Sequence, residues 1–187
     1  MLPTRTLLPL AIIAGTLAFA ACDDDDPILE ENEEELITTV TLTLTPDGGA
    51  FVTFSLIDLD GPGGVAPVTT SAPLAANTEY GFAIQLLNAT ETPPENVTLE
   101  VAEEAEEHQF FFEVDGVDVD VAYGDTDSEG RPIGIVGTMT TNDAGTGTLT
   151  VTLRHEPAKD AAGVVDGDIT NAGGETDVEA EFDLVVE

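Results

Sequence analysis

From residue 36 onward, apolar residues recur at every second position, and this alternation limits what the chain can fold into. In LITTVTLTLT, for example, Val40, Leu42 and Leu44 share one face and threonines occupy the other. A period of two is typical of strands that bury one face, whereas a helix needs a period near 3.6. Segments with strand character are residues 36–44, 52–56, 65–74, 80–86, 108–114, 117–123, 133–141, 147–155 and 176–187.

The spacing of these segments predicts an all-β fold. Turn signals such as Pro46-Asp47-Gly48-Gly49 separate the strands at short intervals, which favours an antiparallel, immunoglobulin-like β-sandwich of about eight or nine strands. Helical spacing occurs once, in residues 95–106, where we expect one short helix. In the last strand, the acidic residues oppose the apolar ones, and we expect all four to face water: Asp177, Glu179, Glu181 and Asp183.

The N-terminus has the features of a lipoprotein signal peptide. Arg5 precedes an uncharged apolar stretch over residues 7–19, which is shorter than the ~20 residues of a membrane span. Small residues then lead into Cys22, the only cysteine. This arrangement resembles a bacterial lipobox, so we expect residues 1–21 to be removed and Cys22 to be lipidated. The alternative is an ordinary signal peptide with an incidental cysteine.

An acidic segment follows the cysteine. Residues 22–35 contain four consecutive aspartates and five glutamates, and charge of one sign at this density keeps a chain extended. We expect a tether that separates a domain of residues 36–187 from the membrane. Acidic residues directly after a lipidated cysteine resemble the surface-export signal of Bacteroidetes lipoproteins, which predicts an outer-membrane lipoprotein exposed at the cell surface. The periplasmic face is the alternative.

The overall charge excludes several partners. The chain has 38 Asp and Glu against 4 Lys and Arg, a formal net charge of −34, so a nucleic-acid backbone or an anionic membrane surface would repel it. One cause of such acidity is adaptation to high salt, because ~1 M salt shortens the Debye length to ~3 Å and screens the repulsion. The other is a set of specific cation sites.

Three acidic loops resemble parts of calcium sites, the third being the short loop of Asp166 and Asp168. Asp125, Asp127 and Glu129 place oxygen ligands at alternate positions before Gly130, as in the first half of an EF-hand loop. The loop has Val136 where the bidentate glutamate would stand, so a second loop would have to complete the coordination. Asp58 and Asp60 form a shorter version. The alternative is that these are acidic turns of an acidic protein.

The two histidines form the other candidate site. His108 and His155 each lie at the end of a predicted strand, and each has a glutamate beside it, Glu107 and Glu156. Should these strand ends be adjacent in space, the four side chains could bind Zn²⁺ or Cu²⁺, because imidazole and carboxylate suit either ion. The alternative is that His155 continues the apolar face of its strand, while Arg154 and Lys159 pair with surplus carboxylates.

The sequence does not favour an enzyme. It has no HExxH, P-loop, GxGxxG or serine nucleophile elbow, and nothing locates a cleft that would perturb one of its many carboxylates.

The strings EEELITT, EEHQFFF, LRHEP and GDITNAGGETD resemble a family of small lipoproteins of Bacteroidetes and neighbouring phyla. Members often have the automatic label "type 1 periplasmic-binding-fold superfamily protein", which implies a larger two-domain α/β fold that this alternating chain cannot build. The resemblance implies no catalytic residue. We expect a lipid-anchored binding protein that captures a divalent metal or another ligand for an outer-membrane receptor. The alternative is a structural or adhesive surface module stabilised by Ca²⁺.

Overall fold

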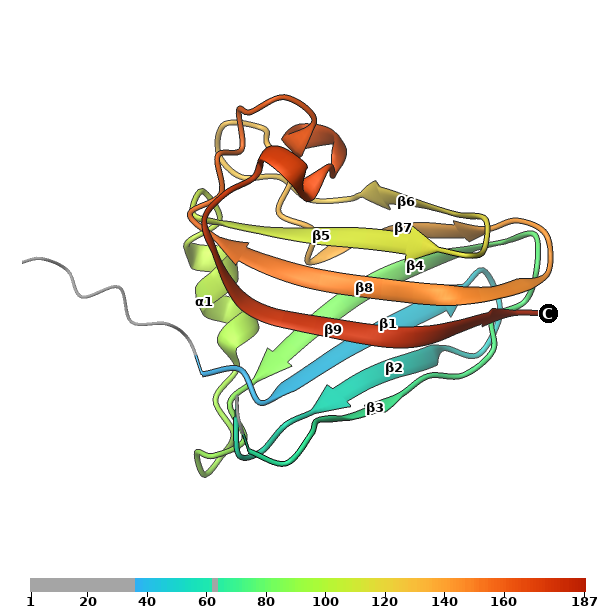
Figure 1. The fold of residues 1–187 in the computed structure, drawn as a ribbon, viewed down its shortest axis with the longest axis horizontal. Helices are drawn as coiled ribbons and strands as arrows, with labels where there is room; N and C mark the ends of the chain where they lie inside the picture. Colours follow the sequence, from blue (N-terminus) through green and yellow to red (C-terminus); the bar gives the residue numbers. More distant parts are fainter. Residues whose placement is uncertain (1–35, 62–63) are drawn as a thin grey trace, which may run out of the picture. The chain divides into compact units, whose positions relative to one another are not determined.

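The computed structural model describes residues 36–61 and 64–187, which form a β-sandwich of nine strands (Figure 1). The predicted signal peptide, Cys22 and the acidic tether lie outside the described residues. The larger sheet has the strand order β3-β2-β1-β4-β7-β6 and the smaller has the order β5-β8-β9. The strands are β1 (Thr39–Pro46), β2 (Val52–Ile57), β3 (Val68–Thr70), β4 (Thr78–Leu87), β5 (His108–Asp115), β6 (Val119–Tyr123), β7 (Val136–Thr141), β8 (Gly145–His155) and β9 (Glu175–Val186).

All neighbouring strands within the two sheets pair antiparallel, as the alternation predicts. In β1 the side chains of Val40, Leu42 and Leu44 are buried, whereas the threonines between them are partly exposed. In β9 the glutamates at 179 and 181 are exposed and alternate with buried apolar residues. The pattern therefore places one face of each sheet in a shared core.

Aromatic side chains join the two sheets across this core. Phe54 of β2 lies against Phe182 of β9 with ring centroids 5.6 Å apart. Phe82 of β4 meets Phe112 of β5 at 5.0 Å. Tilted pairs of this kind contribute ~0.5–1.5 kcal/mol each beyond the apolar area they bury. The strands are therefore stacked as a sandwich with interlocking side chains.

The predicted helix exists but is shorter than expected. Helix α1 spans Val97–Glu103 and buries Val97 and Val101. After it, a turn in which the Glu107 amide bonds to the Glu104 carbonyl at 2.9 Å leads directly into β5. Like charges three and four residues apart destabilise a helix, and the glutamates of this segment explain why the helix ends early.

A second layer covers the outer face of β5. The segment between β8 and β9 forms two short 3₁₀ turns, η1 (Val164–Asp166) and η2 (Ile169–Asn171), drawn in orange-red at the top of Figure 1. Val164 and Ala172 bury Phe111, which points away from the main core. This segment connects the end of β8, which contains His155, to the start of β9, which contains Asp177.

The immunoglobulin-like subtype is not confirmed. Immunoglobulin constant domains divide their strands four and three, whereas the described strands divide six and three. No helix among the described residues is long and apolar enough to cross a membrane.

Candidate metal centre

The two histidines face each other across the smaller sheet. In the register of β5 and β8, His108 lies opposite His155, and their rings stack with centroids 4.6 Å apart and planes 11° from parallel. Only 1% of His108 and 7% of His155 is exposed. The sequence predicted that both lie at strand ends, and the antiparallel register brings those ends together.

His108 is held from both sides of its ring. Its Nδ1 lies 3.2 Å from the Glu104 carbonyl oxygen, and its Nε2 lies 3.6 Å from Asp177 Oδ2. A carbonyl only accepts hydrogen bonds, so Nδ1 donates the proton in this contact. Burial lowers the pKa of His108, and the neighbouring His155 acts in the same direction, whereas the hydrogen bond to Glu104 opposes both. The net effect is a pKa of His108 below its ordinary value.

Asp177 reaches His108 because β9 contains an irregularity. The register of β8 with β9 shifts between Leu153 and Arg154, so that Arg154 pairs with Thr176 and Leu153 pairs with Val178. Asp177 is the extra residue, and only 2% of its side chain is exposed. The expectation that Asp177 faces water with the other acidic residues of β9 is therefore wrong, because a bulge breaks the period of two.

Three potential metal ligands, Glu107, His155 and Glu156, lie close together next to the two stacked histidines. One ligand atom each from Glu107, His155 and Glu156 lies within 4.8 Å of the other two, and Glu107 Oε2 is 3.7 Å from His155 Nε2. Glu107 ends the turn before β5 and Glu156 follows β8. The Glu156 amide donates to the Glu107 carbonyl at 2.6 Å. The backbone itself therefore holds the two carboxylates beside the imidazole.

The chain adopts an uncommon conformation at this point. Glu156 has a φ of 48°, a left-handed region that few residues other than glycine and asparagine occupy. Gly174 lies so close that a Cβ there would overlap the His155 carbonyl oxygen. Strained backbone of this kind clusters at functional sites, and here it directs the Glu156 side chain toward Glu107.

The stacking separates the roles of the two histidines. A metal ion lies in the plane of each imidazole that binds it, at ~2.0–2.1 Å from the nitrogen. Lone pairs on two nearly parallel rings 4.6 Å apart do not converge on one such point. The candidate centre is therefore Glu107, His155 and Glu156, with His108 as the ring that supports His155.

In the loop predicted to bind Ca²⁺, the carboxylates of Asp125 and Asp127 already accept hydrogen bonds from N–H groups. Both carboxylate oxygens of Asp125 accept backbone amides, from residues 134, 135 and 136 at 2.7–3.1 Å. Asp127 accepts the amides of Glu129 and Arg131 on one oxygen, and the side chains of Arg131 and Lys159 on the other. Glu129 is exposed and pairs with Arg131 at 3.0 Å. A calcium ion would have to displace these donors.

Lys159 pairs with a carboxylate, as the sequence suggested, but it is also buried, which the sequence did not predict. Only 2% of Lys159 is exposed, and its ammonium donates to Ala105 O at 2.5 Å, Pro132 O at 3.1 Å and Asp127 Oδ2 at 3.2 Å. Burial lowers the pKa of Lys159, although Asp127 opposes this effect. Burial alone would raise the pKa of Asp127, but hydrogen bonds from Arg131 and Lys159 lower it.

The shorter acidic loop is also stabilised internally. Asp58 accepts the Gly61 amide at 3.0 Å and Asp60 accepts the Val65 amide at 2.8 Å. The two residues between, 62–63, lie outside the described part of the chain. The role of Asp58 and Asp60 in binding Ca²⁺ stays a prediction.

Comparison of the chain with protein-family models, with curated proteins and with solved structures found no match.

Proposed function

We propose that this protein is a non-catalytic binding module that captures one divalent transition-metal ion, Zn²⁺ or Cu²⁺. The observation that supports this proposal is the convergence of Glu107, His155 and Glu156, whose ligand atoms lie within 4.8 Å of one another. Imidazole nitrogen and carboxylate oxygen are both ligands that Zn²⁺ takes in proteins. The nitrogen ligand favours Zn²⁺ or Cu²⁺ over Ca²⁺ and Mg²⁺, which prefer oxygen.

The exposure of the ligands suits uptake and release of the ion. His155 is buried, whereas both glutamates are exposed, so an ion can enter from the carboxylate side. Three protein ligands leave a fourth position free, which a ligand from a partner can fill. The net charge of −34 raises the local concentration of cations around the protein.

The cellular setting in this proposal is the outer membrane. Lipidation of Cys22 would anchor the domain, and the acidic segment of residues 22–35 would hold it away from the lipid surface. An outer-membrane receptor would then receive the ion. A structural module stabilised by Ca²⁺ has less support, because amides, Arg131 and Lys159 already occupy the carboxylates of the main candidate loop.

The test is a competition titration of the purified protein against a chromophoric chelator, with Zn²⁺ and Cu²⁺ in turn. We expect one equivalent to bind. His155→Phe removes a ligand and should weaken binding at least 10-fold. His108→Phe keeps a ring for His155 to stack on and should change the affinity less than 3-fold.

The control variant is Glu79→Gln, which removes one exposed carboxylate from β4 in the other sheet. It should leave the affinity unchanged. The proposal fails if no stoichiometric ion binds, or if Glu79→Gln weakens binding as much as Glu107→Gln does. Circular dichroism checks that each variant is folded.

A further inference from the structure

The outer face of the larger sheet is nearly uncharged, although the chain has a net charge of −34. Small side chains dominate it, because the register places Thr43 of β1 between Thr53 of β2 and Ala83 of β4. Among the described residues, carboxylates occur on this face only at Glu79 and Asp120, which flank the same residue of β7. The rest of the face therefore has threonine, serine and apolar groups without fixed charge.

The described part of the chain leaves this face open to solvent. The residues that point outward from β1, β2 and β4 are exposed or half-buried, and none of them is buried. The exposed fraction is 43% for Ile57, 62% for Val68 and 39% for Val136, which also point outward. The face thus combines exposed apolar side chains with rows of hydroxyls.

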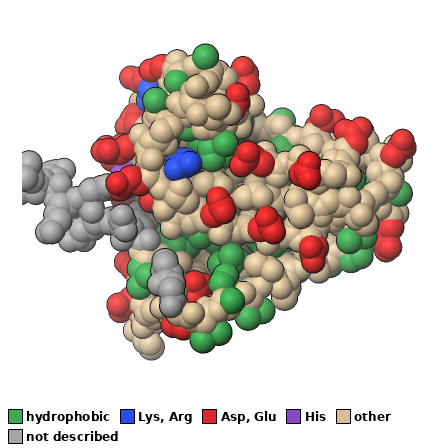
Figure 2. All heavy atoms as spheres, viewed as in Figure 1, with side chains coloured by type: hydrophobic (Ala, Val, Ile, Leu, Met, Phe, Trp, Pro, Cys, Tyr) green, Lys and Arg blue, Asp and Glu red, His purple; other side chains and the backbone are tan. Residues whose placement is uncertain are grey.

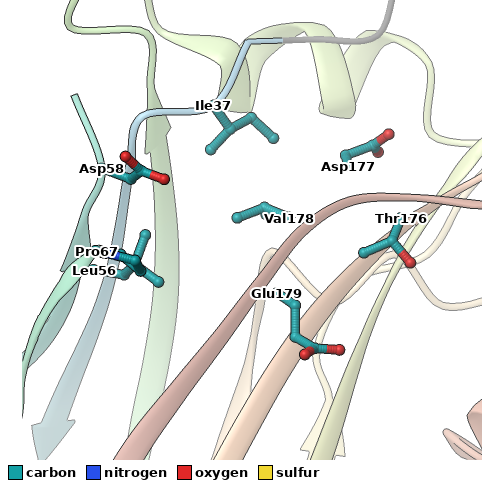
Figure 3. Close-up of a pocket in the computed structure, with 8 residues that line it drawn as sticks. All are labelled: Ile37, Leu56, Asp58, Pro67, Thr176, Asp177, Val178 and Glu179. Atoms are coloured by element: carbon teal, nitrogen blue, oxygen red, sulfur yellow. The ribbon is translucent and has the colours of Figure 1, made fainter. Parts of the chain in front are cut away.

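Other surfaces of the sandwich are acidic. On the outer face of the smaller sheet, Glu113 and Glu181 flank one threonine of β8, and Figure 2 shows acidic side chains spread over this side of the domain. A pocket hollows the side of the sandwich next to β9 (Figure 3), and three of the residues that line it are acidic, Asp58, Asp177 and Glu179. Two copies of the chain that met at either surface would bring carboxylates together.

This distribution of charge selects a second copy of the chain as the partner of the larger sheet. A hydroxyl both donates and accepts hydrogen bonds, whereas a carboxylate only accepts them. A face with hydroxyls can therefore bond to an identical face, as the self-complementary interface of a twofold dimer requires. A basic partner would instead bind the acidic surfaces.

The area of the face reaches the lower limit for a specific interface. The sheet has six strands, and a spacing of ~4.8 Å gives a width of ~24 Å. The eight residues of β1, at ~3.3 Å each, give a length of ~26 Å. The face therefore covers ~600 Å² per copy, and the ~1,200 Å² of a dimer is where specific interfaces begin. We expect a weak dimer.

We propose that the outer face of the larger sheet is the interface of a homodimer, in which two copies pack these sheets face to face. The twist of each sheet sets the strands of the two copies ~30° apart. Salt strengthens the dimer, because the Debye length falls from ~10 Å at 0.1 M to ~3 Å at 1 M and the repulsion between the two acidic copies is then screened.

Sedimentation equilibrium of the purified protein tests this proposal, in about 0.1 M and about 2 M NaCl with EDTA to remove metal ions. We expect a monomer–dimer equilibrium whose Kd is at least 10-fold lower at the higher salt concentration, with no larger species because a twofold interface is complete with two copies. A protein that stays monomeric at about 0.5 mM in high salt, or dimers that salt weakens, would overturn the proposal.

Two variants make the same change on opposite faces of the sandwich. Thr43→Glu places a carboxylate near the centre of the proposed interface, where Thr43 lies between β2 and β4, and should weaken dimerisation at least 10-fold. Thr150→Glu places it on the outer face of the smaller sheet and should change Kd less than 2-fold. Equal effects of the two variants, or a larger effect of Thr150→Glu, would overturn the proposal. Circular dichroism checks that both variants are folded.

The dimer is independent of the proposed metal centre. That centre lies at the ends of β5 and β8 in the smaller sheet, so His155→Phe should leave the Kd of dimerisation unchanged. Dimers that EDTA or His155→Phe abolishes would assign the contact to a bridging metal ion and overturn the proposal.

Discussion

Replacement of Lys159 by methionine should destabilise the domain far more than loss of a surface charge would. The ammonium is almost fully buried and donates to two carbonyl oxygens and to Asp127. Methionine has a similar length but donates no hydrogen bond, so Lys159→Met leaves these acceptors without their donor.

The magnitude follows from these contacts. Removal of one member of a buried ion pair costs ~3–5 kcal/mol. Arg131 Nε still donates to Asp127 at 2.9 Å, so the loss should fall at the lower end, ~3 kcal/mol. This is a large share of the ~5–15 kcal/mol by which domains are typically stable.

Urea unfolding at fixed pH and salt measures the effect. With an m-value of ~2 kcal/mol/M, the midpoint should fall by ~1.5 M. Arg131→Met is the comparison. Arg131 shares Asp127 with Lys159, but part of its side chain and its partners Glu129 and Asp160 are exposed, so the midpoint should fall less than for Lys159→Met. A midpoint for Lys159→Met within 0.2 M of wild type would refute the assigned role of the ammonium.

Three further predictions concern titration and ion binding. Because folding lowers the pKa of Asp127, its contribution to stability is complete above its ordinary pKa of ~3.9 and is lost as pH falls through the folded value. The gap in unfolding free energy between wild type and Asp127→Asn should therefore narrow between pH 6 and pH 2.5, and a constant gap would contradict this. In ¹⁵N-imidazole NMR spectra, His108 should titrate below its ordinary ~6.5 with the proton on Nδ1, and an Nε2–H form would contradict the contact with Glu104. Ca²⁺ and Mg²⁺ at equal concentration should give the same melting temperature, and a specific rise with Ca²⁺ would favour the structural module.

Alternation along the chain was enough to predict the all-β class and the approximate position of every strand. It succeeded because each strand buries one face, so that burial alternates along β1 and along β9 beyond the bulge at Asp177. It could not assign strands to sheets, because pairing depends on contacts distant in sequence. The division into six and three strands therefore differs from the immunoglobulin-like expectation.

The candidate site was predictable in part. Strand ends containing His108 and His155, each beside a glutamate, were visible in the sequence, and the register of β5 with β8 places them together. The alternation of residues in the sequence does not reveal the bulge in β9 that places Asp177 beside His108. The burial of Lys159 was also hidden, because its acceptors come from Ala105, Asp127 and Pro132, distant from it in the sequence.

The central claim is that one imidazole and two carboxylates bind a transition-metal ion at the ends of β5 and β8. X-ray absorption at the zinc edge, on protein loaded with one equivalent of Zn²⁺, tests it most directly. We predict a shell of nitrogen and oxygen at ~2.0–2.2 Å with the outer scattering of a single imidazole, retained in His108→Phe and lost in His155→Phe. Scattering from two imidazoles, or a spectrum that His155→Phe leaves unchanged, would contradict the account.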